Sequence, residues 1–351
     1  MKKQIMAGIL ALLLLLPSMS LSACSRPPEK YSAYSFDYFD TVTTVTGYAP
    51  SQEAFDEVTA EIFRLLGEYH KLYTIYHRYE GMENLCTVNE LVEGHHRTVS
   101  VDRRIIDLLL YAKEMHDRTD GRVNIAMGSV LSLWHTYRTQ GSNDPASSTL
   151  PPMDKLRDAA NHTDIQNMVI DEANCTVTLT DPAMTLDVGA VAKGYAVERI
   201  AQALEEKGIT GYVLNVGGNV RAIGSKADGT PWTVGIENPD EESEEAYLAY
   251  LAISGMSLVT SGNYQRYYVV DGVRYHHIID PTTLMPAEGF TSVSVLTKSS
   301  ADGDALSTAL FCMTLEEGMA LIESLPDTEA MWLLSTGEKQ YSSGFASYTG
   351  S

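Results

Sequence analysis

The sequence has few cysteines, a shortage of positive charge and no long apolar run beyond its first residues. Four cysteines among 351 residues are too few for a small disulfide-stapled scaffold. The 46 acidic side chains outnumber the 25 basic ones and give a formal net charge of −21. This acidity argues against nucleic acid as the main partner, because a polyanion is repelled by a surface of like sign. What remains is a globular composition with 44% hydrophobic residues, which excludes a disordered or collagen-like chain.

The N-terminus has the pattern of an export signal. Lys2 and Lys3 precede an apolar run from Ile5 to Leu16, which is shorter than the roughly 20 residues of a membrane-spanning helix but suits a signal peptide. The run leads to Leu21-Ser22-Ala23-Cys24, which resembles the lipobox of bacterial lipoproteins, where the cysteine is lipidated and becomes the new N-terminus. An ordinary signal peptide with an incidental cysteine is the alternative.

This signal divides the chain into three expected parts. They are a signal peptide over 1–23, a tether over 24–35 that follows lipidated Cys24, and one domain over 36–345. We expect the domain to be anchored to the cell membrane on its extracytoplasmic face. The remaining cysteines, Cys86, Cys175 and Cys312, are expected to be buried free thiols, with one disulfide among them as the alternative.

The hydrophobic periodicity predicts an α+β fold with mixed sheets and packed helices. Helices are predicted over 51–73, 102–118, 190–207 and 302–313, the first capped by Ser51. Strands are predicted over 212–216 and 232–237, and hairpins over 168–179 and 267–279. The second hairpin turns at Asp271-Gly272, which suits a type I′ turn. Residues 138–151 are rich in Ser, Pro, Asn and Gly and are expected to form an exposed excursion.

Two segments could bind a phosphate with its metal ion. Residues 187–194 run from a strand end into a helix, where small residues allow close approach, the helix N-terminus favours anions and Lys193 adds positive charge. A purely structural helix start fits that segment equally well. Asp304 and Thr308 stand four positions apart on a second helix, so their hard oxygen atoms share one face and suit Mg²⁺ better than zinc. A helix cap is the alternative for Asp304.

Two further segments allow either a functional or a structural interpretation. Gly217-Gly218 separates two strands and could bring backbone close to a ligand, although a tight turn explains both glycines. His276 and His277 are adjacent in a predicted strand and therefore point to opposite faces, which argues against a two-histidine metal site. One of them could be a catalytic histidine or simply a packed one.

Taken together, the motifs resemble the FAD:protein FMN transferase (ApbE) family over residues 36–335. In chain order they are Phe39-Asp40-Thr41, Tyr73-Thr74-Ile75-Tyr76, Asp120-Gly121-Arg122-Val123-Asn124, Asp187 to Gly194, Gly217-Gly218, Trp232-Thr233-Val234-Gly235-Ile236, Thr260-Ser261-Gly262, His277-Ile278-Ile279-Asp280-Pro281 and Asp304-Ala305-Leu306-Ser307-Thr308. The resemblance implies an Mg²⁺-dependent transferase with a fold of two closely associated subdomains. Such an enzyme splits FAD, releases AMP and joins FMN by a phosphoester bond to a Thr or Ser of an acceptor flavoprotein, such as a subunit of a membrane redox complex.

The resemblance also implies roles for individual residues. The metal would be held by the side chains of Asp304 and Thr308 and by the backbone carbonyl of Ala190, with Ser307 as a weaker candidate. FAD would be bound by Phe39, Tyr76, Arg122, Val123, Asn124, Asp187, Lys193 and Ile278. The acceptor hydroxyl must lose a proton, and His277 is our hypothesis for the base because an imidazole pKa near 6.5 suits work at neutral pH. Asp280 would orient it or ligate indirectly.

The sequence departs from the family pattern in places, and two other functions stay open. Residues 122–125 read Arg-Val-Asn-Ile where the family often has Ala-Phe-Asp-Pro. Family members with Asn at the place of Tyr76 resemble FAD pyrophosphatases, so the tyrosine favours the transferase. The alternatives are an Mg²⁺-dependent FAD pyrophosphatase and a non-catalytic flavin-binding lipoprotein. Release of AMP would exclude the second.

Overall fold

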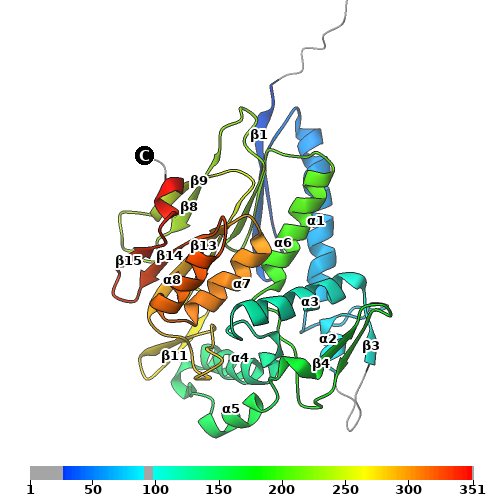
Figure 1. Ribbon diagram of the computed structural model, residues 1–351, viewed down its shortest axis with the longest axis vertical. Coiled ribbons are helices and arrows are strands. Elements are labelled where there is room, and N and C mark those ends of the chain that lie inside the picture. The colour runs from blue at the N-terminus through cyan, green and yellow to red at the C-terminus, as the bar shows by residue number, and fades with distance from the viewer. Residues whose placement is uncertain (1–26, 91–97, 350–351) are drawn as a thin grey trace, which may run out of the picture.

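An eight-stranded antiparallel sheet forms the centre of the fold in a computed structural model, which describes residues 27–90 and 98–349 (Figure 1). The strands, in spatial order, are β1 (Glu29–Tyr38), β2 (Thr41–Ala49), β6 (Tyr212–Val216), β7 (Asn219–Ile223), β10 (Ser257–Gly262), β13 (Phe290–Thr297), β14 (Glu329–Leu334) and β15 (Lys339–Tyr341). Sequence neighbours such as β1 and β2 pair directly, whereas β10 lies between β7 and β13.

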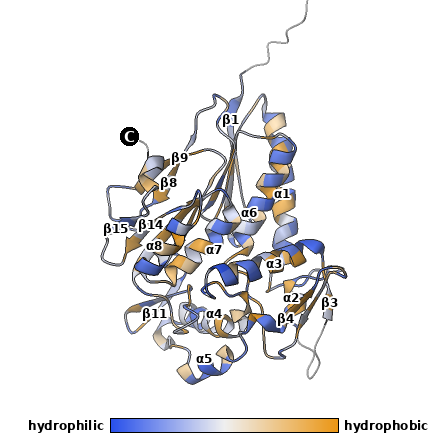
Figure 2. Cartoon of the chain, in the orientation of Figure 1, coloured by the Kyte–Doolittle hydropathy of each residue, from blue (hydrophilic) through white to orange (hydrophobic). Residues whose placement is uncertain are grey.

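One face of this sheet is covered by helices. They are α1 (Gln52–Tyr73), α6 (Ala192–Glu206), α7 (Ser300–Phe311) and α8 (Leu315–Ser324). Helix α1 buries Phe55, Ile62 and Leu66 at helical spacing and presents both hydrophobic and hydrophilic residues in Figure 2. The Ser51 side chain caps α1 by accepting a hydrogen bond from the backbone N–H of Ala54 at 3.3 Å. The large core between helices and sheet includes Phe311 and Trp332, both fully buried.

The other face is covered in part by a hairpin of β8 (Trp232–Glu237) and β9 (Tyr247–Ile253), with the C-terminal turn η4 (Phe345–Tyr348) beside it. Trp232, Leu251 and Phe345 form a separate small core there.

The remaining elements lie together below the main sheet in Figure 1. They are α2 (Leu85–Asn89), α3 (Arg103–Arg118), η1 (Ile125–Met127), α4 (Gly128–Asn143), η2 (Pro145–Ser147), α5 (Met153–Ala160), η3 (Ile165–Asn167), a small sheet of β3 (Thr98–Ser100), β5 (Thr176–Leu179) and β4 (Met168–Asp171), and a hairpin of β11 (Tyr267–Val270) and β12 (Val273–His276). Trp134 of α4 and Tyr268 of β11 belong to a third core.

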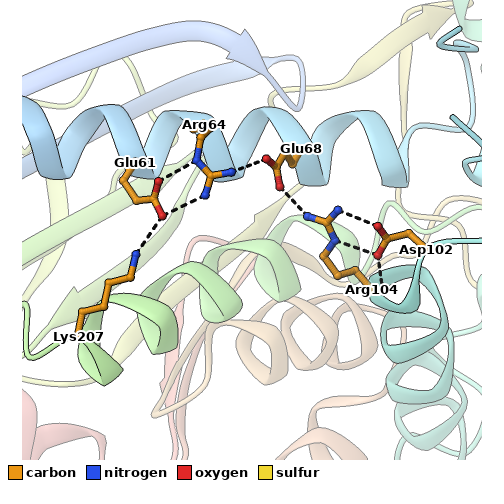
Figure 3. Close-up of polar contacts among 6 residues, drawn as sticks. All are labelled: Glu61, Arg64, Glu68, Asp102, Arg104 and Lys207. Atoms are coloured by element: carbon orange, nitrogen blue, oxygen red, sulfur yellow. Dashed lines mark hydrogen bonds and ion pairs between the residues drawn. The ribbon is translucent and has the colours of Figure 1, made fainter. Parts of the chain in front are cut away.

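A chain of ion pairs links three helices at the surface (Figure 3). Arg64 of α1 bonds to Glu61 and Glu68 on the same helix. Glu68 also accepts from Arg104 of α3 at 2.7 Å, and Lys207, at the end of α6, lies 3.0 Å from Glu61. These contacts tie α3 and α6 to α1 without burying any of the charges completely.

Most of the expected elements are confirmed, as is the α+β class. Helices α1, α3, α6 and α7 match the four predicted ranges closely, and Asp271 and Gly272 have φ of 50° and 81°, as a type I′ turn requires. In the described residues Cys86, Cys175 and Cys312 are all free, although only Cys312 is buried. No described helix is long and apolar enough to cross a membrane.

Three boundaries were wrong. The excursion expected over 138–151 begins later, because α4 continues to Asn143 and packs Gly141 against Tyr268 of the hairpin. The expected tether over 24–35 is ordered strand from Glu29, since β1 pairs with β2 along this stretch. The second strand of the 267–279 hairpin ends at His276. The signal over 1–23 and Cys24 lie outside the described residues.

Candidate active site

A cavity of about 320 Å³ lies between the main sheet with its helices and the elements grouped below them. Its walls come from the turn between β1 and β2, the end of α1, the segment around η1 and α4, the starts of α6 and α7, and the loops around β11 and β12. The fold therefore gathers residues from nearly the whole chain, from Phe39 to Thr308, around one space.

One end of the cavity, which we call the deep end, is a tightly bonded polar cluster. Lys193, Asp304 and Thr308 border the space, and Asn219 is fully buried beside them. Asp304 is only 4% exposed, and its carboxylate accepts from the backbone N–H of Gly194 at 2.8 Å and from Lys193 Nζ at 3.2 Å. Lys193 Nζ also donates to Asn219 Oδ1 at 2.8 Å. A Cβ at Gly194 would lie 2.3 Å from the Ser300 carbonyl, so the close approach of α6 and α7 requires glycine there.

The oxygen atoms at this end fit a magnesium ion. Asp304, Thr308 and Ala190 all border the cavity and offer a carboxylate, a hydroxyl and a backbone carbonyl. Among the described residues no cluster of three His, Cys, Asp or Glu side chains could hold a metal ion alone. Mg²⁺ commonly binds through one or two carboxylates and completes its shell with substrate phosphates and water, so this sparse set suits it.

Ser307 is set apart from the other three metal candidates. It is fully buried and absent from the cavity wall, and its hydroxyl donates to the Asp304 carbonyl at 3.1 Å and bonds to Ser261 Oγ at 2.8 Å. These contacts occupy its oxygen within the fold. Ser307 therefore joins α7 to β10 and does not border the cavity.

A buried ion pair supports the deep end from behind. Glu198 of α6 accepts from Arg221 Nε of β7 at 3.2 Å and from the backbone N–H of Ser300, at the start of α7, at 2.8 Å. Arg221 is 4% exposed and Glu198 7%. This contact joins the three elements that carry Lys193, Asn219 and Asp304, and nothing in the sequence pattern had pointed to it.

The two adjacent histidines have different surroundings, because His276 is the last residue of β12 and His277 lies beyond the strand. His276 is buried, donates from Nε2 to the Ala287 carbonyl at 2.8 Å and accepts from the Ile278 N–H at 3.2 Å. His277 borders the cavity, and its buried Nδ1 has no hydrogen-bond partner among the described residues. Burial, followed by the positive charges of Arg266 and Arg138, lowers the pKa of His277 to about 3. His277 is thus a neutral imidazole in the free protein.

Asp280 does not orient His277. Its carboxylate accepts from the backbone N–H of Thr282 at 2.8 Å and lies 3.5 Å from Arg122 Nη1, and it is not part of the cavity wall. These bonds close a local turn and hold Arg122 in place. The expected pairing between Asp280 and His277 was therefore wrong.

All eight residues expected to bind FAD border the cavity. They are Phe39, Tyr76, Arg122, Val123, Asn124, Asp187, Lys193 and Ile278. Asn124 is also committed locally, because its side chain caps η1 and donates to the Thr163 carbonyl at 2.9 Å. The segment 122–125 differs from the family pattern, yet Arg122, Val123 and Asn124 still border the cavity.

Comparison with known proteins decides the family. The model of the ApbE family matches residues 39–332. The chain belongs to the ApbE family. A protein of Klebsiella pneumoniae (strain 342) named FAD:protein FMN transferase is 32% identical over 279 residues, which are 79% of this chain and 82% of that relative. A protein of the same name from Treponema pallidum (strain Nichols) is 34% identical over 260 residues, or 70% of each chain.

Solved structures agree with this assignment. The ApbE protein of Thermotoga maritima superposes with a TM-score of 0.79 at 26% identity, covering 92% of this chain and all of that one. The flavin transferase ApbE of Vibrio cholerae gives 0.75 at 26% identity, with the same two shares. The expected fold is confirmed, and the names of the curated relatives confirm the expected enzyme class, a transferase.

At its rim, this ApbE-family cavity holds basic residues that the sequence analysis missed. Arg138 and His135 come from α4, and Arg266 comes from the loop after β10. His135 Nδ1 lies 3.2 Å from the hydroxyl of Tyr76. Burial lowers the pKa of both His135 and Arg138. His135 and Arg138 are three positions apart, so they share one face of α4, but no helix was predicted over residues 128–143.

Proposed function

We propose that the protein is an Mg²⁺-dependent FAD:protein FMN transferase that releases AMP and joins FMN by a phosphoester bond to a Thr or Ser of an acceptor flavoprotein. The observation that carries the proposal is a single cavity with two features. Lys193, Asp304 and Thr308 border its deep end, and His277, whose buried Nδ1 has no hydrogen-bond partner among the described residues, borders the same space. The names of the curated relatives support the same activity.

The deep end would bind the diphosphate of FAD. A bound Mg²⁺, held by Asp304, Thr308 and the Ala190 carbonyl, would supply Lewis-acid stabilisation of the charge that builds on phosphate oxygens. Lys193 holds a fixed ammonium there, since Asn219 and Asp304 both accept from it at 2.8 and 3.2 Å. Donors fixed before the substrate arrives need no reorganisation as charge develops in the transition state.

His277 would accept the proton of the acceptor hydroxyl as its oxygen bonds to the phosphorus of FMN and the bond to AMP breaks. Its imidazole is neutral and its Nδ1 has no partner among the described residues, so it has a nitrogen available for a substrate. With a pKa of about 3 it is a weak base in the free protein. Burial is the largest cause of this low pKa and the charges of Arg266 and Arg138 come next, so a bound anionic substrate that offsets those charges would raise the pKa in part.

The location is also part of the proposal. Lipidation of Cys24 would anchor the domain to the outer face of the cell membrane, where flavin-carrying subunits of membrane redox complexes would be the acceptors. The lipobox-like residues 21–24 support this placement.

The test combines the chain from residue 25 onward with FAD, Mg²⁺ and a threonine-bearing acceptor domain, and follows AMP and the intact mass of the acceptor. AMP together with a mass gain of one FMN is the expected result. AMP with free FMN and an unmodified acceptor at several acceptor sequences would indicate the pyrophosphatase, and the absence of AMP would indicate a flavin-binding protein.

The role of His277 is tested in the same assay. His277→Ala should lower transfer by about 10²-fold or more, the usual contribution of a general base. His162→Ala is the matched control, because His162 pairs with Asp181 outside the cavity. Full transfer by the His277 variant would exclude it as the base.

A further inference from the structure

The hairpin of β1 and β2 carries large apolar side chains on its outward side. Ser35 of β1 pairs with Thr43 of β2, and both are buried on the side where α1 packs. Because successive side chains of a strand alternate, their neighbours Tyr34, Phe36 and Val42 point to the opposite side. These three are 72%, 67% and 48% exposed, and the rings of Tyr34 and Phe36 lie 6.1 Å apart. We call the three side chains the apolar patch.

No described element covers the apolar patch. The β8–β9 hairpin covers the outward side of the sheet at Tyr48, whose ring lies 5.5 Å from that of Trp232, but leaves the patch exposed. Contiguous exposed apolar side chains of this kind are typical of a surface that contacts a partner or a membrane.

The surroundings of the patch carry no negative charge. The other outward positions of the two strands are Lys30, Ser32, Thr44 and Thr46. The chain has 46 acidic residues, yet none of them stands at an outward position of this strand pair. Moving a carboxylate out of water is costly, so its absence makes this side of the hairpin suited to apolar surroundings.

The start of the chain indicates what covers the patch. Only five residue steps separate Cys24 from Glu29, the first residue of β1, and they span at most about 17 Å. With a lipid on Cys24, as proposed above, the start of β1 stays within that distance of the membrane interface. The apolar patch lies on the same strand and its partner β2. Tyrosine is enriched at the headgroup level of membranes, and phenylalanine is common on the apolar side of elements that lie in the interface.

We propose that the apolar patch of Tyr34, Phe36 and Val42 binds the interface of the lipid bilayer to which Cys24 anchors the chain. This inference rests on the proposed lipid anchor and is independent of the transferase chemistry. A lipid tether alone leaves a domain free to rotate. The turn Phe39–Thr41, which joins β1 to β2, borders the cavity, so contact of this hairpin with the bilayer would hold the cavity in one orientation relative to the membrane.

The experiment uses tryptophan probes in the full, lipidated chain. The three native tryptophans are at most 5% exposed, so they give a background that lipid does not reach. Phe36→Trp and Val42→Trp place a probe on each strand of the patch. Glu57→Trp is the matched control, because Glu57 is exposed on α1, which packs on the other side of the same two strands.

Each variant is reconstituted into phosphatidylcholine vesicles with and without bromine on the acyl chains, since bromine quenches tryptophan on contact. Zwitterionic lipid is used because an anionic membrane repels an acidic chain. We expect bromine to lower the emission of Phe36→Trp and Val42→Trp, and both probes to emit at shorter wavelength than in water. The emission of Glu57→Trp and of the wild type should not change.

A second comparison separates binding by the patch from mere closeness to the anchor. Val42→Trp is combined with Tyr34→Ser and Phe36→Ser, which removes both rings while the anchor stays. Most of the quenching should then be lost, because the two rings supply most of the apolar area. Both changes are at exposed positions, so the fold should be kept, and circular dichroism checks this.

Four results would overturn the inference. Equal quenching of Glu57→Trp and Phe36→Trp would mean that the domain rotates freely on its tether. Absence of quenching at both patch positions would mean that the patch stays in water. Quenching of Val42→Trp that persists without the two rings would assign the contact to the short tether. A wavelength shift that depends on the amount of protein per vesicle, without quenching by bromine, would assign the patch to a second copy of the chain.

The same samples separate this inference from the proposals on which it does and does not rest. Intact mass shows whether Cys24 is lipidated, and an unlipidated chain would contradict the anchor and the inference together. Release of AMP from FAD reports the enzyme activity independently of any quenching.

Discussion

The deep end and the rim of the cavity are built in opposite ways. At the deep end every charge has a partner: Lys193 with Asp304 and Asn219, and behind them Arg221 with Glu198. At the rim, neither Arg138 nor Arg266 has a carboxylate within 4 Å among the described residues, and the charge of Asp187 acts on Arg138 only from farther away. The deep end is complete before a ligand binds, as a preorganised site for charge stabilisation should be. The rim keeps guanidinium donors that no carboxylate of the described residues occupies, so they are available to a ligand.

The largest effect is expected when the buried pair of Arg221 and Glu198, which supports the deep end, is removed. We expect Arg221→Met to lower the free energy of unfolding by about 3–5 kcal/mol, because it leaves the Glu198 carboxylate buried without its cation. Transfer activity should fall as well, since Glu198 also holds the start of α7 through Ser300. Urea unfolding followed by circular dichroism measures the stability change.

Its control is Arg103→Met. Arg103 lies on α3 with its side chain 52% exposed and pairs with Asp107 at the surface, so the loss should stay below about 1 kcal/mol. A loss for Arg221→Met no larger than for Arg103→Met would show that the deep end does not depend on the buried pair.

The second change removes a charge of the deep end without altering its shape. Asp304→Asn should reduce AMP release by about 10²–10³-fold, a range typical of losing one electrostatic contact to the transition state. The asparagine can still accept from the Gly194 N–H, so the fold should be kept. Asp302→Asn is the control: Asp302 lies on the same helix but bonds to Tyr111 at 3.0 Å, outside the cavity. An unchanged Mg²⁺ dependence of AMP release in Asp304→Asn would contradict the assigned metal ligand.

The sequence revealed the deep end far better than the rim, and the reason is chain distance. Asp304 and Thr308 are one helical turn apart, so their common face follows from helix geometry alone. Lys193 lies at a glycine-rich helix start, and neighbouring residues in the sequence are enough to predict an anion site there. Arg138 and Arg266 are 128 positions apart and meet only because α4 packs against the hairpin that follows Arg266. No spacing rule connects such residues.

The same limit explains the errors in the fold and in the expected role of Asp280. Residues 138–143 have weak helical propensity, but burial of Trp134 and Gly141 against the hairpin keeps α4 helical. Asp280 is only three positions from His277, yet the chain turns between them and its carboxylate bonds to Thr282. Proximity in sequence therefore predicted a pairing that local turn geometry prevents.

The smallest expected effect concerns the exposed ion pairs of Figure 3, which contrast with both regions of the cavity because solvent screens them. Hydrogen bonds from Arg64 and Lys207 lower the pKa of Glu61 from 4.5 to about 2. Its contribution to stability is therefore present above about pH 4.5 and lost as the pH falls toward about 2. Glu61→Gln should cost less than about 1 kcal/mol at pH 7. Glu57→Gln, on the same helix, is the control. Urea unfolding between pH 7 and 3 should show that the loss of unfolding free energy in Glu61→Gln becomes smaller with acid and with added salt. A loss that stays constant would mean that the shape of the side chain, not its charge, sets the contribution of Glu61.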